Sequence, residues 1–257
     1  MSHALVTGAG RRVGAAIARD LAQRGWQLTL HYNSSMAEAE GLAHRIREAG
    51  GLARAIGADL REEGAPARLL AQAETDGPVA LVVNNAAIFA EDDPQSATAL
   101  SLREHFDINA GAPILLAKAL HAARLGDGGR AAVVNILDNK LYAPNADFFS
   151  YTVSKFALAG ATKALAMALA PHVRVCGIAP SLLLVSGNQT EEAFQAARRV
   201  NPQREPVPLD DVCRAVAFLA DTPSINGDII AVDGGQNLMN LPRDVAYLDA
   251  AIVKRFQ

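Results

Sequence analysis

Short aliphatic runs alternate with longer amphipathic runs along almost the whole chain, and this alternation restricts the fold more than any other feature. The aliphatic runs are nearly continuous, as in strands buried on both faces of a parallel sheet, and the longer runs have helical spacing. The predicted strands are 4–7, 27–32, 52–57, 79–84, 131–137, 173–179 and 228–232. The predicted helices are 14–24, 37–49, 61–75, 100–125, 149–170 and 209–220.

Right-handed crossovers leave few topologies for such units, and the leading one is a doubly wound sheet. We therefore predict the α/β class: a single Rossmann-type domain over residues 1–238, with a mostly seven-stranded parallel sheet and helices on both faces. The longest interruption, residues 181–208, contains a predicted short helix at 191–200 and follows a late strand. An insertion at that place usually covers the ligand crevice, so we predict a substrate flap.

Composition excludes several classes of partner. Half of the 257 residues are hydrophobic and the net charge is −3, so no basic field is available to attract nucleic acid or an anionic membrane. Cys176 and Cys213 are far apart and are interpreted as buried free thiols, which fits a cytoplasmic protein better than a secreted one. No basic n-region precedes a long apolar stretch, and no uncharged run reaches the length of a membrane span. We expect no metal site.

A glycine-rich loop, Thr7–Gly14, follows the first predicted strand and opens the first predicted helix. Gly8 allows a tight turn, Gly10 lets the backbone approach a ligand, and Gly14 lets the helix pack on the strand. The helix N-terminus would then face a pyrophosphate. Val13 stands where the third glycine of G-x-G-x-x-G would fall, so an ordinary glycine-rich turn is the alternative.

The end of the second strand indicates which nicotinamide cofactor the chain would take. An NAD site usually has an acidic residue there, but the sequence reads His31-Tyr32-Asn33-Ser34-Ser35. The absence of an acid removes a repulsion for a 2′-phosphate, and Arg11 or Arg12 could pair with one, so we predict NADPH/NADP⁺. The alternative is that both arginines are solvated. Asp59 could accept a hydrogen bond from adenine or cap the helix that follows it.

Tyr151 and Lys155 are four residues apart on a predicted helix and therefore lie on one face of it. Tyrosine titrates near ~10, and a neighbouring ammonium group lowers that pKa, as a general acid at neutral pH requires. The spacing alone is common, and a surface tyrosine with a solvated lysine is the plain alternative.

Taken together, these motifs resemble the short-chain dehydrogenase/reductase family over roughly residues 3–238. The resemblance is carried by Thr7–Gly14, Asn84-Asn85-Ala86-Ala87, Asn109, Tyr151-x-x-x-Lys155 and Asp233-Gly234-Gly235. The resemblance implies that Tyr151 donates a proton and that Lys155 binds the nicotinamide ribose and lowers the pKa of Tyr151. It also implies that Asn109 holds a proton-relay water and that Asn85 supports the cofactor. The cofactor-binding set that it implies is completed by Val13, Asn33, Ser34, Leu60, Ala86, Pro180 and Ser181.

Two departures from the usual family pattern resemble the pteridine reductase and dihydromonapterin reductase group. Arg12 replaces a glycine of the loop, and Asp138 stands 13 residues before Tyr151, where the family usually has serine. A third feature agrees, because Phe89 lies where that group has a ring stacking on the pterin. Asp138 as a turn residue and Phe89 as simple core are the alternatives.

The resulting hypothesis is an NADPH-dependent reductase in which a dihydropterin receives a hydride at C6 and a proton from Tyr151 at N5. Asp138 would bond Tyr151 or the pterin amino edge, Arg12 would bridge cofactor and substrate, and Leu182–Leu184 would begin the flap. The alternatives are a carbonyl or 3-oxoacyl reductase of the same family and a non-catalytic NADPH-binding regulatory protein.

The resemblance also suggests a homo-oligomer, a tetramer or dimer, in which the alanine-rich helix 154–170 could contact a neighbour. The tail, 239–257, carries Val245, Leu248, Ile252 and Val253 on one possible helical face, which would dock on its own domain or on a neighbour.

Overall fold

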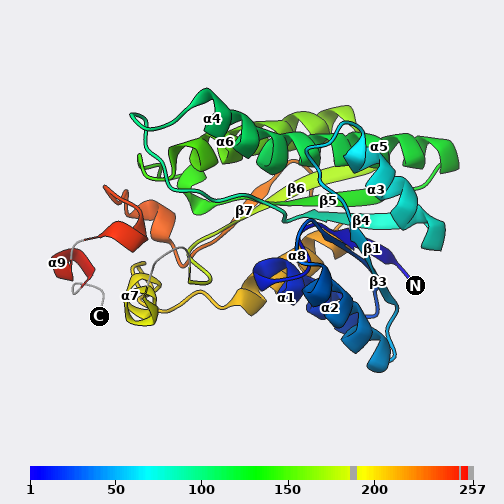
Figure 1. Cartoon of the computed structure of the whole chain (residues 1–257), viewed down its shortest axis with the longest axis horizontal. Coiled ribbons are helices and arrows are strands. Elements are labelled where there is room, and N and C mark those ends of the chain that lie inside the picture. The colour runs from blue at the N-terminus through cyan, green and yellow to red at the C-terminus, as the bar shows by residue number, and fades with distance from the viewer. Residues whose placement is uncertain (186–189, 249, 254–257) are drawn as a thin grey trace.

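A seven-stranded parallel sheet forms the centre of the computed structural model, which describes residues 1–185, 190–248 and 250–253 (Figure 1). The strands are β1 (His3–Val6), β2 (Gln27–Tyr32), β3 (Ala53–Gly57), β4 (Val79–Asn84), β5 (Ala131–Ile136), β6 (Val173–Pro180) and β7 (Ile229–Val232). Their order is β3-β2-β1-β4-β5-β6-β7, so the chain winds outward in both directions from the β1–β4 pair. The predicted doubly wound sheet is confirmed.

Helices cover both faces of this sheet, with α1, α2 and α8 on one face and α3, α4, α5 and α6 on the other (Figure 1). Their bounds are α1 (Arg12–Gln23), α2 (Met36–Glu48), α3 (Ala65–Ala73), α4 (Ala99–Phe106), α5 (Ala112–Asp127), α6 (Phe149–Ala168), α7 (Glu191–Ala197), α8 (Leu209–Asp221) and α9 (Ala250–Val253). Short turns of other helical type are η1 (Glu74–Asp76), η2 (Asp107–Gly111), η3 (Asn139–Leu141), η4 (Gln236–Leu238) and η5 (Val245–Tyr247).

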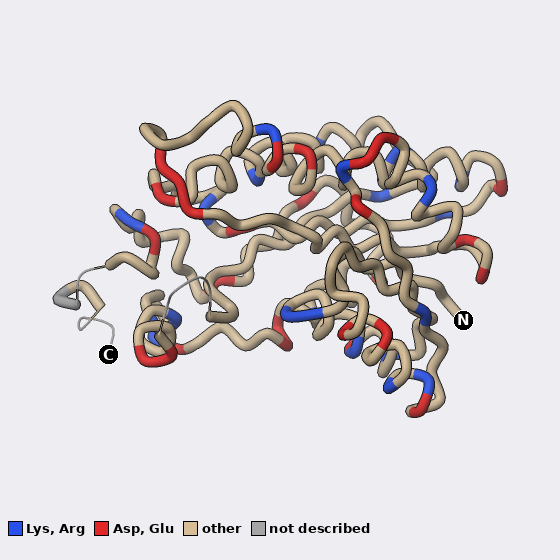
Figure 2. Tube along the Cα trace, viewed as in Figure 1, with Lys and Arg blue, Asp and Glu red and all other residues tan. Residues whose placement is uncertain are grey.

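Each face of the sheet has its own apolar core, because the strand side chains alternate between the two helical layers. Leu28, Leu30 and Leu81 pack toward the layer of α1 and α8, whereas Leu5, Val82 and others pack toward that of α3, α5 and α6. Basic and acidic residues are interspersed along the chain trace (Figure 2). Both cysteines are buried free thiols, as predicted. Among the described residues no helix is long and apolar enough to span a bilayer.

Two predicted helices differ from the observed ones for local reasons. The predicted helix 100–125 is interrupted by η2, a π-helical turn between α4 and α5 that contains Asn109. The predicted helix 61–75 begins only at Ala65, because Gly64 before it has φ 74° and Pro66 occupies its first turn. Proline is favoured in a first turn and excluded from an interior, so the start of α3 is fixed there.

The tail folds back onto the domain that precedes it. Val245 lies in η5 and Ile252 and Val253 lie in α9, whereas Leu248 belongs to neither element, so the predicted helical face is not part of one continuous helix. Val245, Leu248 and Val253 nevertheless join an apolar cluster with Ala197 and Val200 at the end of α7. The predicted short helix at 191–200 is confirmed as α7 followed by a turn. The predicted flap, residues 181–208, includes positions 186–189, which lie outside the described residues.

Candidate active site

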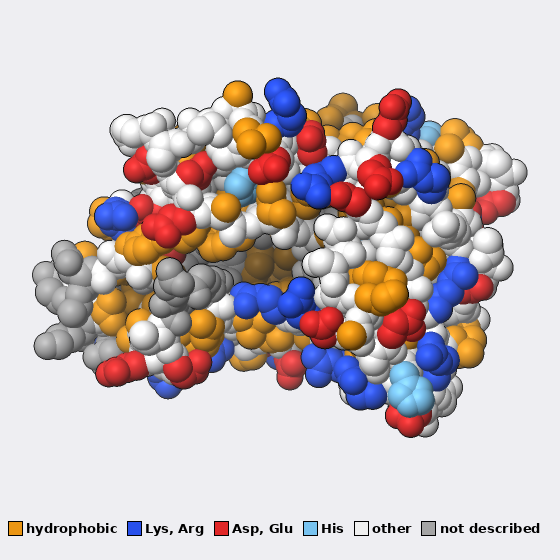
Figure 3. Space-filling model, in the orientation of Figure 1, with side chains coloured by type: hydrophobic (Ala, Val, Ile, Leu, Met, Phe, Trp, Pro, Cys, Tyr) orange, Lys and Arg blue, Asp and Glu red, His pale blue; other side chains and the backbone are white. Residues whose placement is uncertain are grey.

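The carboxyl ends of β1, β4, β5 and β6 open into one large cavity of about 1020 Å³. Figure 3 shows the hollow in the middle of one face, with hydrophobic side chains on its floor and basic side chains at its rim. Sixteen predicted site residues line it: Gly8, Arg11, Arg12, Val13, Asn33, Ser34, Leu60, Asn85, Ala86, Phe89, Asp138, Tyr151, Lys155, Pro180, Ser181 and Leu182. The other predicted site residues, Gly10, Gly14, Asp59 and Asn109, are not among the residues that line the cavity.

The glycine-rich loop has the close packing that a dinucleotide site requires. Gly8 has φ 62°, in the left-handed region that favours glycine. A Cβ on Gly14 would lie 2.3 Å from the carbonyl oxygen of Gly8, so only glycine lets α1 start this close to the loop. Asn85 donates from Nδ2 to the carbonyl oxygens of Thr7 (2.9 Å) and Gly8 (3.1 Å) and so supports the loop, while its contact with a cofactor stays a prediction. The loop residues therefore fit a pyrophosphate at the N-terminus of α1.

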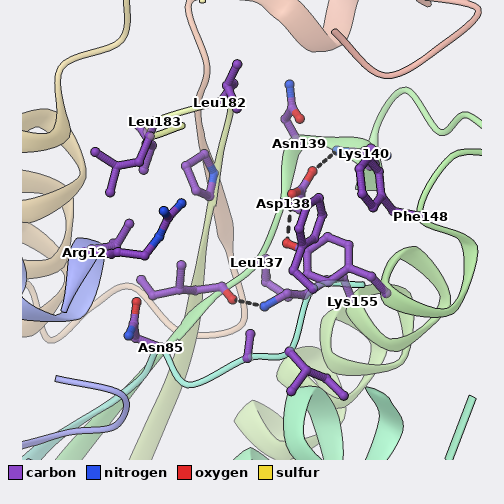
Figure 4. A pocket seen from close by; sticks show the side chains of 18 of the residues that line it. Arg12, Asn85, Leu137, Asp138, Asn139, Lys140, Phe148, Lys155, Leu182 and Leu183 are labelled. Carbon is purple, nitrogen blue, oxygen red and sulfur yellow. Dashed lines mark hydrogen bonds between the residues drawn. The ribbon is translucent and has the colours of Figure 1, made fainter. Parts of the chain in front are cut away.

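Arg12 occupies an unusual backbone conformation in this loop. Its φ is 54°, which explains why the usual family pattern has glycine at this position. From there Nη1 donates to the carbonyl oxygen of Val185, 2.7 Å away, at the start of the predicted flap. Figure 4 shows Arg12 and Leu183 across the cavity from Asp138 and Phe148. Arg12 thus connects the phosphate loop to the segment that follows β6.

The opposite end of the cavity, next to β2, has the character expected for a phosphorylated adenosine. Asn33, Ser34 and Ser35 line it together with Arg11 and Arg61. Asp59 forms an ion pair with Arg61 at 2.6 Å and also accepts a hydrogen bond from its backbone N–H. Because α3 starts at Ala65, Asp59 does not cap that helix.

Tyr151, Asp138 and Lys155 meet in the middle of the cavity. The Tyr151 hydroxyl donates to Oδ2 of Asp138 at 2.9 Å, and Oδ1 of Asp138 accepts from the backbone N–H of Lys140 at 2.9 Å. Lys155 donates from Nζ to the carbonyl oxygen of Ile136 at 2.7 Å, and this Nζ lies 5.5 Å from the centroid of the Tyr151 ring. Asp138 is therefore placed to act directly on the tyrosine hydroxyl.

The electrostatics of this group differ from the expectation. Burial raises the pKa of Tyr151 well above its ordinary value, and the charge and hydrogen bond of Asp138 raise it further. The net shift is therefore opposite in sign to the one expected from a neighbouring ammonium group, and the effect of Lys155 on this pKa stays a prediction. Burial lowers the pKa of Lys155 itself to about 8, while it raises the pKa of Asp138. Burial thus opposes the charged form of each of the three groups.

Asn109 lies in the π-helical turn η2 and is almost fully buried. Its Oδ1 accepts from the backbone N–H of Ile88, and its Nδ2 donates to the Ile88 carbonyl oxygen and to Oγ of Ser154. Ser154 lies on α6 between Tyr151 and Lys155. The side chain of Asn109 therefore fixes α6 against the segment after β4, while its role toward a relay water stays a prediction.

Phe89 lines the cavity with its ring 44% exposed. One side of it stacks on Phe148 at a centroid distance of 4.1 Å, and it meets Tyr151 edge-on at 4.7 Å. Phe148 precedes α6 with φ 55°, a left-handed conformation that is rare for a bulky residue and typical of functional sites. An exposed aromatic face next to the tyrosine hydroxyl suits a flat heteroaromatic ligand.

The comparisons with known proteins agree with this site. A family model described as enoyl-(acyl carrier protein) reductase matches residues 8–237. The human dehydrogenase/reductase SDR family member 4 is 31% identical over 252 residues, which cover 90% of this chain and 86% of that protein. The chain belongs to the short-chain dehydrogenase/reductase family. This confirms the predicted resemblance, and with it an oxidoreductase.

Two other relatives of this short-chain dehydrogenase/reductase carry more specific names. Dihydromonapterin reductase from Klebsiella pneumoniae is 30% identical over 240 residues, which cover 91% of this chain and 96% of that protein. The crystal structure of FolM alternative dihydrofolate reductase 1 from Brucella canis, complexed with NADP, is 39% identical, with a TM-score of 0.88. That similarity covers 92% of this chain and 94% of the Brucella chain.

Sequence reasoning missed several residues at the far end of the cavity of this short-chain dehydrogenase/reductase. They are Lys140, Phe148, Arg243, Asp244, Val245 and Tyr247. Lys140 and Phe148 lie in the turn between β5 and α6. The only feature of the sequence that could have indicated this part of the site is the pair Phe148-Phe149 before Ser150. The others belong to the tail, whose return to the site has no counterpart in the local sequence pattern. Among the described residues no three His, Cys, Asp or Glu side chains form a metal-ligating group.

Proposed function

We propose that this protein is an NADPH-dependent reductase of dihydropterins. The observation that carries the proposal is the 2.9 Å hydrogen bond from the Tyr151 hydroxyl to Asp138, beside the exposed ring of Phe89. A carboxylate suits a pterin, which presents several N–H donors, better than the serine that is usual in the family. The names of the Klebsiella and Brucella relatives support the same substrate class.

The residues that would hold the cofactor follow from the loop and the β2 end. Gly8, Gly10, Val13 and Gly14 would shape the pyrophosphate site, with support from Asn85. The 2′-phosphate would meet Arg11 or Arg12 and the group Asn33, Ser34 and Ser35, where no acid ends β2. Arg11 is only weakly engaged by Glu38, at 3.6 Å on the surface, so a phosphate can displace that partner. Leu60 and Ala86 would border the adenine and nucleoside, and Pro180 and Ser181 the nicotinamide.

In the proposed reaction, NADPH supplies the hydride that C6 of the dihydropterin receives. Tyr151 gives its proton to N5, and the neutral hydroxyl that burial preserves is the form that can do so. Burial raises the pKa of Asp138, and its carboxylate accepts the hydrogen bond of the Tyr151 hydroxyl, so it orients that hydroxyl for proton transfer. Lys155 would bind the nicotinamide ribose and, as an ammonium, offset the phenolate. Arg12, Phe89 and Leu182 would contact the substrate, and Asn109 would hold a relay water.

A carbonyl or 3-oxoacyl reductase is the second candidate, because the family model that matches is described by an acyl carrier protein substrate. A carboxylate at Asp138 is unfavourable near a developing oxyanion unless it is protonated. The raised pKa of Asp138 weakens that objection, so substrates have to decide between the two candidates. A non-catalytic NADPH-binding regulator is the third, and the complete set of Tyr151, Lys155 and Asn109 argues against it.

We further propose a cytoplasmic homo-oligomer, a tetramer or dimer, built from one domain over residues 1–238 with the tail, 239–257, packed on it. Large apolar side chains are exposed on α4, α5 and α6, which supports a contact between copies there. They are Leu100, Leu102, Phe106, Leu115, Val153, Phe156 and Met167. Light scattering after size-exclusion chromatography tests this proposal, and a monomer at micromolar concentration would contradict it.

The proposed activity is tested by following NADPH oxidation with dihydromonapterin, dihydrobiopterin, dihydrofolate and an acetoacetyl thioester. We expect turnover with the dihydropterins. Turnover with the thioester alone would keep the family and reject the pterin site, whereas NADPH binding without turnover on any compound would favour the regulator.

A further inference from the structure

Lys140 is a buried cation at the far end of the cavity. It lies in η3, shortly after β5, and its side chain is only 7% exposed although it lines the cavity. Burying an ammonium group is costly unless hydrogen bonds and an opposite charge compensate for the lost hydration. The contacts of Lys140 therefore show which parts of the chain its charge holds together.

Two segments bind the ammonium group of Lys140. In the turn between β5 and α6, Nζ donates to the carbonyl oxygen of Asp147 at 2.9 Å and to Oδ1 of Asn145 at 3.2 Å. From the tail, Asp244 forms an ion pair with Nζ at 2.8 Å, and the Asp244 side chain is 14% exposed. A buried ion pair thus joins the tail to the turn that precedes α6.

Asp244 is held in this place by its neighbours in the tail. Arg243 pairs with Asp147 at 2.7 Å, and Asp147 also accepts the backbone N–H of Asp244 at 2.7 Å. On the other side, Val245 is buried in the apolar cluster at the end of α7. The carboxylate of Asp244 is therefore fixed next to Lys140 by contacts on both sides of it.

The backbone of Lys140 contacts the acceptor of the Tyr151 hydroxyl bond. Its N–H donates to Oδ1 of Asp138 at 2.9 Å, while Oδ2 of the same carboxylate accepts from the Tyr151 hydroxyl at 2.9 Å (Figure 4). Burial raises the pKa of Asp138, and the N–H and the ammonium group of Lys140 both oppose that shift, whereas the charge of Asp244 adds to it. Lys140 therefore favours the ionised carboxylate that can accept from Tyr151.

The ammonium group of Lys140 also contacts the aromatic wall of the cavity. Nζ lies 4.9 Å from the centroid of the Phe148 ring, and Phe148 stacks on Phe89 at 4.1 Å. A cation over a ring face attracts that ring, which helps to keep Phe148 against Phe89. One buried group thus contacts the tail, the turn and the ring that supports the proposed pterin-binding face.

We propose that Lys140 is a positioning residue for the reduction, which holds the Asp138 carboxylate toward the Tyr151 hydroxyl, and that Asp244 of the tail holds Lys140. The tail then belongs to the active site, because it supplies the counter-charge of the group that orients Asp138. This inference rests on the proposed function and deepens it, since it assigns the residues that set the charge and the direction of the Tyr151 acceptor.

Several ionisable groups surround the Asp138 carboxyl. Those that face it or line the same cavity are Lys140 and Asp147 of the turn, Tyr151 and Lys155 of α6, Arg243 and Asp244 of the tail, Glu91 after β4 and Arg12 of α1. The pKa of Lys155 is about 8, so this lysine titrates on the alkaline side of neutrality. The test therefore uses the acid limb of the pH profile and the direction in which each variant moves it.

The test is the pH profile of kcat/KM for dihydromonapterin at saturating NADPH. In the wild type, kcat/KM should be lost toward acid pH as Asp138 is protonated. Lys140→Met removes the ammonium group that lowers the pKa of Asp138, so the acid limb should move to higher pH and kcat/KM on that limb should fall about tenfold. Asp244→Asn removes a charge that raises the same pKa, so its acid limb should move to lower pH.

The opposite directions separate this role from a structural one, because a general loss of packing would lower kcat/KM in both variants without moving the limbs apart. Arg68→Met on α3 and Asp20→Asn on α1 each remove one partner of a surface ion pair and are the matched controls. Both controls should keep the wild-type profile. If Lys140→Met does not fold, Asp244→Asn decides alone, because asparagine keeps the shape of the side chain and an acceptor for Nζ.

A ¹³C chemical-shift titration of the Asp138 carboxyl carbon, assigned by its loss in Asp138→Asn, repeats the comparison without turnover. The titration midpoint should rise in Lys140→Met and fall in Asp244→Asn. Midpoints or acid limbs that move in the same direction in both variants, or that stay unchanged in Asp244→Asn, would overturn the inference. Wild-type protein that reduces no dihydropterin would instead refute the proposed function, and the carboxyl titration would still test the effect of Lys140 and Asp244 on Asp138.

Discussion

Replacing Asp138 by serine, the residue usual in the family, separates the two leading substrate classes. The carboxylate accepts two hydrogen bonds of 2.9 Å, one from the Tyr151 hydroxyl and one from the Lys140 N–H, and the shorter serine side chain cannot keep both. A hydrogen bond to a charged group contributes about 1.5–3 kcal/mol, which corresponds to roughly 10- to 150-fold in rate. We therefore expect kcat/KM for dihydropterin to fall by about that factor.

The effect on a carbonyl substrate should have the opposite sign. The charge and hydrogen bond of Asp138 both raise the pKa of Tyr151, so their removal makes the tyrosine a stronger acid and removes a negative charge from the oxyanion region. Activity with an acetoacetyl thioester should therefore be kept or gained in Asp138→Ser. NADPH oxidation with each substrate measures both effects.

The control for this experiment is Asp20→Asn, which removes a carboxylate from an exposed pair with Arg24 on α1. It should leave both activities unchanged, and fluorescence titration should give the same Kd for NADPH in all three proteins. Wild-type rates of dihydropterin reduction in Asp138→Ser would refute the role that we assign to the carboxylate.

Four further predictions concern the cofactor half of the site. Because the pKa of Lys155 is about 8, its ammonium form is lost as the pH rises through that value. The value of kcat/KM for NADPH should therefore fall above about pH 8, and a flat pH profile would contradict this prediction. Between about pH 8 and pH 10.5, Lys155 is protonated in the unfolded chain but largely deprotonated in the folded protein. The free energy of unfolding should therefore rise with pH in that window. Arg12→Gly removes the guanidinium group that we propose as a phosphate partner, so the Kd for NADPH in fluorescence titration should rise about tenfold. The free energy of unfolding should not fall, because Arg12 has a left-handed backbone conformation that glycine adopts more easily. Gly14→Ala places a Cβ 2.3 Å from the Gly8 carbonyl oxygen and should lower the free energy of unfolding, measured by chemical denaturation, by about 1–3 kcal/mol. The control is Gly160→Ala, whose added Cβ would have no atom within 4 Å and which should not lower the free energy of unfolding.

The sheet and the cofactor loop could be predicted because their signals are local. Each strand is a short apolar run, and the glycines that start α1 stand next to one another in the sequence. In the doubly wound sheet that the alternation predicts, β1, β4 and β5 are neighbours and their carboxyl ends lie at the same edge. That convergence brings Asn85, Asp138 and Tyr151 to one cavity, as the motifs indicated.

The remaining features depend on contacts between distant segments. The π-helical turn around Asn109 has no signature in the apolar spacing of α4 and α5, because it is stabilised by bonds to Ile88 and Ser154. The tail segment 241–247 reaches the cavity through pairs that join residues about a hundred positions apart, such as Asp147 with Arg243. No periodicity within the tail could indicate those partners.

The direction of the pKa shift of Tyr151 also could not be predicted from the sequence. The i, i+4 spacing correctly places Tyr151 and Lys155 on one face of α6, and it suggests an ammonium beside a phenol. The spacing contains no information on burial, and burial is the largest cause of the shift for both groups. The sign of a pKa shift therefore required the structure.

The central claim is that Tyr151 donates the proton in a dihydropterin reduction at this site, and Tyr151→Phe tests it most directly. Phenylalanine keeps the ring that packs edge-on against Phe89 and removes only the hydroxyl. We expect NADPH to bind with nearly the wild-type Kd while dihydropterin-dependent NADPH oxidation is abolished. Normal dihydropterin turnover in Tyr151→Phe would contradict the account.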